Sequence, residues 1–138
     1  MADARQIREG IKANLDLIPG CQISAYALSS PTLPCLYVLT GPAEIVMFDI
    51  AMARGGDEWT WRVVAVTGLI SDIGSQMLMD EFLSPDGDRS VKAAVESDKT
   101  LGGLVDDVHV THATGYTQLL REGAGPVLVV EFHVRVIT

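Results

Sequence analysis

Apolar and polar positions along this chain follow two different periods, and the change between them marks its central unit. Two apolar runs, residues 45–53 and 59–70, alternate in the manner of strands and flank a loop that contains two glycines. Alternation predicts β-strands, and glycines supply the positive φ angles that a hairpin loop requires. Both runs are apolar on both faces near their centres, so each face of the predicted hairpin needs a covering layer.

A helical period replaces the alternation at residues 71–83, which predicts a helix lying across the hairpin. Ser71 or Asp72 caps this helix, because an oxygen at that position accepts from the free amides of the first turn. The sequence Ser-Pro-Asp-Gly at residues 84–87 ends it. The expected buried stripe consists of Ile73, Met77, Leu78 and Phe82.

The segment before the hairpin predicts one helix and two strands. Residues 3–18 carry an apolar stripe at helical spacing, and Asp3 with Gln6 forms a capping-box pattern at its start. Strands are expected at residues 21–28 and 35–39, separated by a loop with two prolines. The stripe of the helix comprises Ala4, Ile7, Ile11, Leu15 and Ile18.

A short helix, a strand and an exposed loop are expected after the central unit. Asp88 or Ser90 caps the helix, which continues to Asp98. Residues 105–111 alternate as a strand, and residues 113–126, which include three glycines, are expected to form an exposed loop. The apolar side of the short helix consists of Val91, Ala94 and Val95.

The clearest alternation in the chain lies at residues 127–137. Glu131, His133 and Arg135 form one face of this predicted strand, and the other face is apolar throughout. One core face and one wet face are typical of strands in antiparallel sheets. The expected buried residues are Leu128, Val130, Phe132, Val134 and Val136.

The order α-β-β-β-β-α-α-β-β separates strands from helices along the chain. Such an order predicts an α+β fold, with a largely antiparallel sheet and a long β-hairpin packed against helices in two layers. The length of 138 residues and the apolar fraction of 48% fit one domain, residues 1–138, with a sizeable core.

Composition and charge narrow the classes of function. The net charge is −8, from 10 basic and 18 acidic residues, which argues against tight sequence-independent binding of nucleic acid. No apolar run reaches the ~18 residues that a membrane span needs. The N-terminus has no apolar core typical of a secretory signal, so a cytoplasmic protein is expected. Cys21 and Cys35 are expected to remain thiols in such a reducing compartment.

No catalytic, metal or cofactor site is expected from the residues. His109 and His112 are three apart on a strand and should face opposite sides. His109 and His133 can be cross-strand neighbours, but two imidazoles without a third ligand are weak grounds for zinc. The run at residues 86–90 begins like a calcium loop but lacks the glycine and glutamate that such a loop requires. The protein is therefore not expected to be an enzyme; a site built from scattered residues is the alternative.

The order of elements and one segment resemble the tail terminator, or tail completion, proteins of long-tailed bacteriophages. From Ser90 the segment has the sequence Ser-Val-Lys-Ala-Ala-Val, and from Thr100 it has Thr-Leu-Gly-Gly-Leu-Val-Asp-Asp-Val. The resemblance covers most of the chain, and Leu-Gly-Gly-Leu-Val-Asp-Asp is its most specific part. Residues 21–34 match nothing in it.

The resemblance implies a structural virion protein with no catalytic residues and no cofactor. Proteins of this family form a ring, usually of six copies, at the head-proximal end of the tail, where the ring stops tail-tube polymerisation and joins the tail to the head connector. The implied partners are further copies of the chain, the major tail tube protein and the head–tail connector protein. The implied location is the tail–neck junction of the virion, after assembly in the host cytoplasm. DNA would pass through the lumen without specific binding, which fits the acidic balance of the chain.

The predicted hairpin supplies the candidates for contact between subunits. Its two tryptophans offer more aromatic surface than one helix can cover, and aromatic residues are common at interface centres. Burial of both tryptophans in the core is the alternative. Other functions left open are a head-completion adaptor of the same particle, a small cellular binding module and an enzyme. The candidate contact residues are Arg54, Gly55, Gly56, Asp57, Glu58, Trp59 and Trp61.

Overall fold

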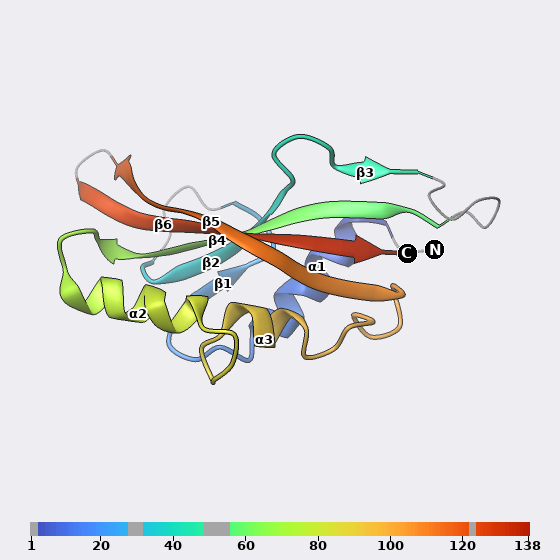
Figure 1. The fold of residues 1–138 in the computed structure, drawn as a ribbon, viewed down its shortest axis with the longest axis horizontal. Coiled ribbons are helices and arrows are strands. Elements are labelled where there is room, and N and C mark those ends of the chain that lie inside the picture. Colours follow the sequence, from blue (N-terminus) through green and yellow to red (C-terminus); the bar gives the residue numbers. More distant parts are fainter. Residues whose placement is uncertain (1–2, 28–31, 49–55, 122–123) are drawn as a thin grey trace.

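The computed structural model describes residues 3–27, 32–48, 56–121 and 124–138, and its helices and strands follow the predicted order (Figure 1). None of the helices in these ranges is long and apolar enough to cross a membrane. The elements are α1 (Ala4–Leu15), β1 (Gln22–Ser24), β2 (Cys35–Thr40), β3 (Val46–Met47), β4 (Glu58–Leu69), α2 (Ile73–Leu83), α3 (Val91–Val95), β5 (Asp107–Arg121) and β6 (Ala124–Ile137).

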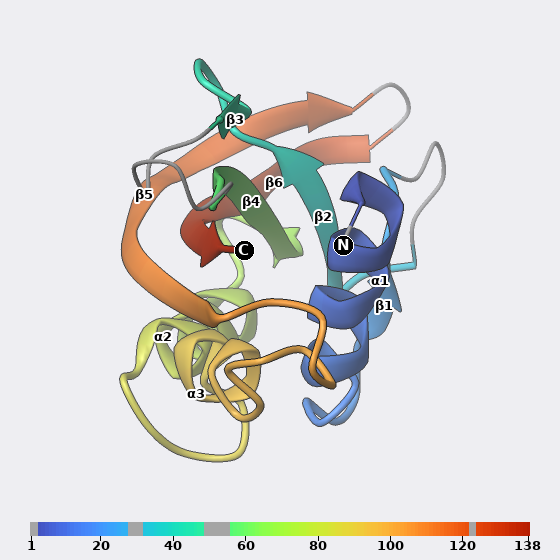
Figure 2. The same ribbon diagram turned by 90° about the vertical axis from the view of Figure 1, so that its right-hand side faces the viewer.

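The strands form a sheet in the spatial order β1-β2-β4-β6-β5, with β3 attached to one end of β4. Neighbouring strands are antiparallel except β1 and β2, which are parallel. The three helices pack against one side of the sheet (Figures 1 and 2). The expected α+β fold, with a largely antiparallel sheet and helices in a second layer, is therefore confirmed.

Strand β6 lies in the interior of the sheet, between β4 and β5, as its alternation predicts. Its paired positions with β4 place Val134 opposite Trp61 and Phe132 opposite Val63, all four on the side that faces the helices. Burial of these pairs removes a continuous apolar surface from water. All five residues expected to be buried on β6 are buried: Leu128, Val130, Phe132, Val134 and Val136.

Helices α1 and α3 begin where their capping residues predict. Asp3 and Gln6 form a complete capping box at the start of α1, and the Ser90 hydroxyl accepts from the Ala93 amide at 3.0 Å at the start of α3. Four residues of the predicted α1 stripe are buried, whereas Ala4 is exposed. The two helices are joined by the buried Asn14 side chain, which donates to the Val95 carbonyl oxygen at 2.8 Å. These local signals were sufficient because each helix presents one dominant apolar face.

The prediction of a long central hairpin is wrong. In the described residues, β3 pairs with β4 only at Val46 and Met47, opposite Trp59 and Glu58. Beyond that point β2 occupies the same edge of β4, and β6 occupies the other edge, so no edge remains for a longer β3. The rest of the first apolar run, residues 49–53, lies outside the described residues.

The buried stripe predicted for α2 is wrong in part. Phe82 is buried and Leu78 packs against the core, as predicted, but Ile73 and Met77 are 71% and 62% exposed. The helix buries Ser75 and Met79 in their place. Helix α2 has apolar residues around most of its circumference, so its periodicity does not single out one face. The packing of Ser75 against Gly68 of β4 orients the helix. The Ser75 hydroxyl fills the space that a Cβ on residue 68 would occupy, so this contact requires glycine there.

The glycine-containing stretch at residues 113–126 is not an exposed loop. Strand β5 continues to Arg121 and β6 begins at Ala124, so most of the stretch belongs to a long hairpin. Three register shifts interrupt the β5–β6 pairing, and Gly115 and Tyr116 adopt positive φ angles at the second one. Such bulges break the alternation of side chains on which the sequence pattern depends.

Candidate functional site

The base of the predicted contact loop is tied to the C-terminus. The Asp57 carbonyl oxygen accepts from the Thr138 amide at 2.9 Å, and the Asp57 amide donates to the Thr138 hydroxyl at 3.2 Å. Glu58 forms an ion pair with Arg135 on β6. Arg54 and Gly55 lie outside the described residues. At the start of β4 lie three half-buried residues, Gly56, Asp57 and Glu58, each of which keeps part of its surface accessible to solvent.

The two tryptophans of β4 occupy different environments. Their rings stack at 6.0 Å, but Trp61 is fully buried and Trp59 is half-buried. The Arg8 guanidinium lies 5.0 Å from the Trp61 ring and donates to the Val38 carbonyl oxygen at 2.7 Å. Trp61 therefore belongs to the core and offers no surface to a partner, whereas Trp59 keeps some.

One exposed apolar surface surrounds β3 at one end of the molecule. Phe48 is 69% exposed, and Ile45 and Met47 are each a little under half exposed. We call these three residues the β3 patch. Val46 and Met47 pair with the end of β4, which holds this segment against the sheet. The β3 patch lies in the segment predicted as the hairpin but contains none of the candidate contact residues named from the sequence.

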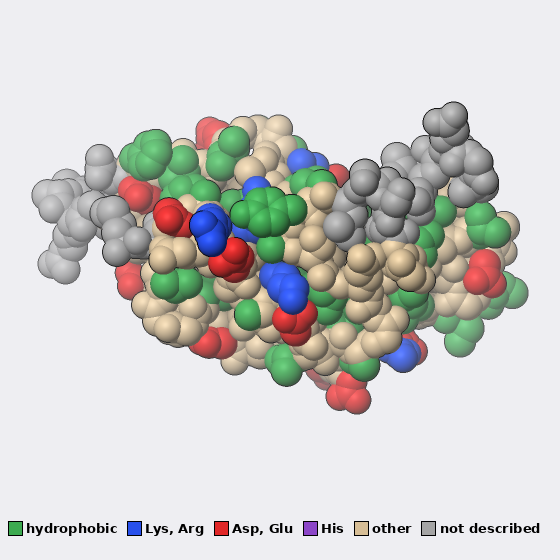
Figure 3. Space-filling view, turned by 180° about the vertical axis from the view of Figure 1, so that it is seen from behind, with side chains coloured by type: hydrophobic (Ala, Val, Ile, Leu, Met, Phe, Trp, Pro, Cys, Tyr) green, Lys and Arg blue, Asp and Glu red, His purple; other side chains and the backbone are tan. Residues whose placement is uncertain are grey.

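A second exposed apolar surface lies at the start of α2. Ile73 and Met77 are one turn apart on the outer face of the helix, and Leu69, at the end of β4, is about half exposed. We call these residues the α2 patch. Hydrophobic side chains gather at this end of the molecule in Figure 3. The signal in the sequence was the excess of apolar residues in α2, more than one buried face can hold.

The two patches lie far apart. In Figures 1 and 2, β3 and α2 are at opposite ends of the molecule, with the sheet between them. Exposed apolar groups that cluster on a folded chain mark contact sites more often than isolated ones do. Two such clusters at opposite ends are suited to contacts that use two different surfaces.

Most basic side chains are already paired with carboxylates. Six of the ten lysines and arginines form ion pairs within the described residues, and the Arg8 guanidinium is held between the Tyr26 and Trp61 rings. Paired charges have little left to offer to phosphate groups. The pairs are Arg5–Glu9, Lys12–Asp16, Arg62–Glu131, Arg89–Glu81, Lys92–Glu96 and Arg135–Glu58.

The histidines are arranged differently from the expectation. The bulge at Thr111 shifts the register of β5, so His109 and His112 face the same side, and His112 rather than His109 pairs with His133. His109 instead lies 3.2 Å from the Glu96 carboxylate. Within the described ranges, no three histidine, cysteine or acidic residues converge as metal ligands. Both cysteines are thiols, with Cys35 buried and Cys21 half-buried.

No model of a protein family matches the sequence, and no curated protein matches it.

Proposed function

We propose that this protein is a structural component of a bacteriophage tail, forming a ring at the head-proximal end that terminates the tail tube and joins it to the head connector. The sequence basis is the resemblance of residues 90–95 and 100–108 to tail terminator proteins. The observation that carries the proposal is the presence of two separate apolar patches at opposite ends of one chain.

Two separate patches favour a particular kind of assembly. A two-fold dimer uses the same surface on both copies, whereas a head-to-tail contact uses two different surfaces and closes into a ring when the rotation between copies permits. In the proposed ring, the β3 patch of one copy contacts the α2 patch of the next. Each contact covers Phe48 on one side and Ile73 and Met77 on the other, which removes exposed apolar surface from both copies.

The test uses two variants that each destroy one patch. Phe48→Asp places a charge in the β3 patch, and Met77→Asp places one in the α2 patch. Sedimentation velocity of the purified wild-type chain should show a ring, and each variant alone should be monomeric. Because each variant retains the patch that the other has lost, an equimolar mixture should form a dimer and stop there. Leu17→Asp is the matched control; Leu17 is 66% exposed but belongs to neither patch, so this variant should form rings.

Two results would contradict the head-to-tail contact. Rings formed by either patch variant alone would show that its patch is not needed. A mixture that remained monomeric, while the Leu17→Asp control assembled, would show that the two patches do not meet.

The proposed ring should not hold DNA. Affinity for DNA comes mainly from neutralisation of phosphates by Lys and Arg, and most of those residues are paired within the chain. A fluorescence anisotropy titration with a duplex at about 0.15 M salt, near physiological ionic strength, should therefore show no binding. Micromolar binding that weakens as salt is added would indicate that the protein binds DNA through its phosphates, which would contradict the proposal that DNA passes through the ring unbound.

A further inference from the structure

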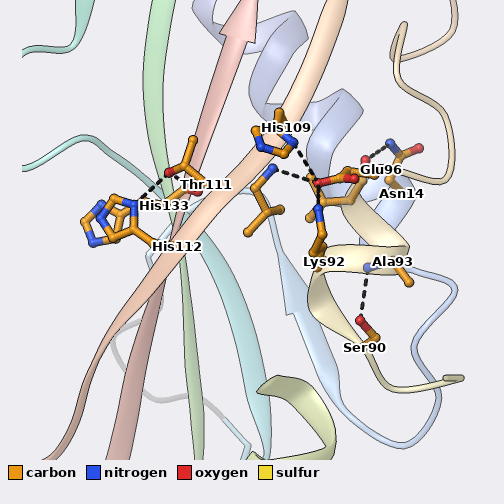
Figure 4. A network of polar contacts seen from close by, with 11 residues as sticks. Asn14, Ser90, Lys92, Ala93, Glu96, His109, Thr111, His112 and His133 are labelled. Carbon is orange, nitrogen blue, oxygen red and sulfur yellow. Dashed lines mark hydrogen bonds and ion pairs between the residues drawn. The ribbon is translucent and has the colours of Figure 1, made fainter. Parts of the chain in front are cut away.

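Two histidines form a stacked pair on the sheet. His112 of β5 and His133 of β6 are direct cross-strand partners, and their ring centroids lie 4.3 Å apart with an angle of 4° between the planes. Figure 4 shows the stacked pair apart from His109, whose ring is directed to the Glu96 carboxylate. The two imidazoles lie in a shallow recess that is also lined by Pro42, Glu44 and Thr60.

One nitrogen of each ring is held by a threonine hydroxyl. The Thr111 hydroxyl lies 2.8 Å from His112 Nδ1 and donates to the His133 carbonyl oxygen at 3.3 Å, so it accepts from Nδ1–H. The Thr114 hydroxyl lies 2.8 Å from His133 Nε2. A histidine that binds a metal normally donates its other N–H to such an oxygen, which fixes the ring and keeps a lone pair on the remaining nitrogen. His112 Nε2 and His133 Nδ1 are the nitrogens left for a ligand.

We propose that His112 and His133 form a binding site for a divalent transition-metal ion of the kind that imidazole favours, such as Zn²⁺, Ni²⁺ or Cu²⁺. The ion would be held by His112 Nε2 and His133 Nδ1 at the usual metal–nitrogen distance of about 2.0–2.1 Å. In the stacked arrangement the two lone pairs lie in nearly parallel planes, so binding requires the rings to tilt toward each other about the last side-chain torsion, which is soft in histidine. Water fills the other coordination positions, so the ion exchanges with solvent. The site lies within one chain and does not depend on ring formation.

The surroundings keep the pair available for a cation. The Arg62 guanidinium is directed to the Glu131 carboxylate at 2.9 Å, which balances its charge near the site. The Glu44 carboxylate, in the same recess, adds negative charge.

The test is isothermal titration calorimetry, in which NiCl₂ is titrated into the untagged protein at pH 7.5. The wild-type chain should bind one ion with micromolar affinity. His112→Ala and His133→Ala should each lower the affinity at least about tenfold, and Thr111→Val, which leaves both ligands in place, should also lower it about tenfold. His109→Ala is the matched control, because His109 is the other histidine of the chain and should not contribute. Circular dichroism confirms that each variant is folded.

Three results would overturn the proposal. Absence of binding by the wild-type chain at millimolar nickel would show that the stacked pair is only a packing contact. An equal loss of affinity in His109→Ala would move the ion to His109 and Glu96. Loss of binding in Cys21→Ser, with both histidines intact, would assign the ion to the half-buried thiol.

Discussion

Replacing Trp61 by alanine should lower the free energy of unfolding by about 3–5 kcal/mol, the usual cost of removing a buried aromatic side chain. Trp61 is among the largest fully buried side chains and belongs to the main core, where it lies opposite Val134 of β6. Its ring also supports the Arg8 guanidinium, which ties α1 to β2. Urea denaturation followed by circular dichroism measures the loss.

The matched control for this variant is Trp59→Ala. Trp59 is partly exposed and lies two residues away on the same face of β4, so its truncation should cost clearly less. Equal losses would mean that Trp59 is as much a core residue as Trp61. The comparison also bears on assembly: Trp61→Ala should lose rings only through unfolding, whereas Phe48→Asp and Met77→Asp should lose rings as stable monomers.

Replacing Glu96 by alanine should lower the free energy of unfolding by about 2–3 kcal/mol, because charged hydrogen bonds are lost and a backbone amide is left without its partner. The Glu96 carboxylate follows α3 and accepts from Lys92 Nζ at 2.5 Å and from the Val110 amide of β5 at 3.0 Å (Figure 4). His109 Nδ1 lies 3.2 Å from the same oxygen. Glu9→Ala is the control, since the exposed Glu9–Arg5 pair should contribute under about 1 kcal/mol.

The contribution of Glu96 should disappear in acid. Burial raises the pKa of its carboxyl, but the Lys92 and Val110 hydrogen bonds and the charges of Lys92 and His109 outweigh burial and hold the pKa below its ordinary value of 4.5. A group with a lowered pKa stabilises the fold above its unfolded-state pKa, and this stabilisation is lost as the pH falls through the folded-state pKa. Urea denaturation of wild type and Glu96→Gln should therefore differ most near neutral pH and converge below pH 4.5. A difference that stayed constant down to about pH 3, well below the usual glutamate pKa, would contradict this.

The two exposed apolar patches could be predicted from the sequence only in part. The sequence indicated that the hairpin holds more aromatic surface than one helix can cover, whereas Ile73 and Met77 of α2 were expected to be buried. Which of these residues are exposed depended on tertiary packing: Trp61 is in the core, whereas Ile73 and Met77 are exposed. The His112–His133 pair was not predicted, because a single bulge at Thr111 changes which histidine faces which.

The sequence by itself determined the order of elements, the caps of α1 and α3, and the buried face of β6. Each of these follows from interactions between residues close together in the chain, or from one unbroken period that leaves a single apolar face. Tertiary structure alone decided the orientation of α2, the short pairing of β3 and the continuation of β5 through residues 113–121. In these three segments the local pattern permits more than one arrangement. For α2, the contact of Ser75 with Gly68 selects one arrangement. For β3, the choice follows from the occupation of both β4 edges by β2 and β6. For β5, it follows from the bulged pairing with β6.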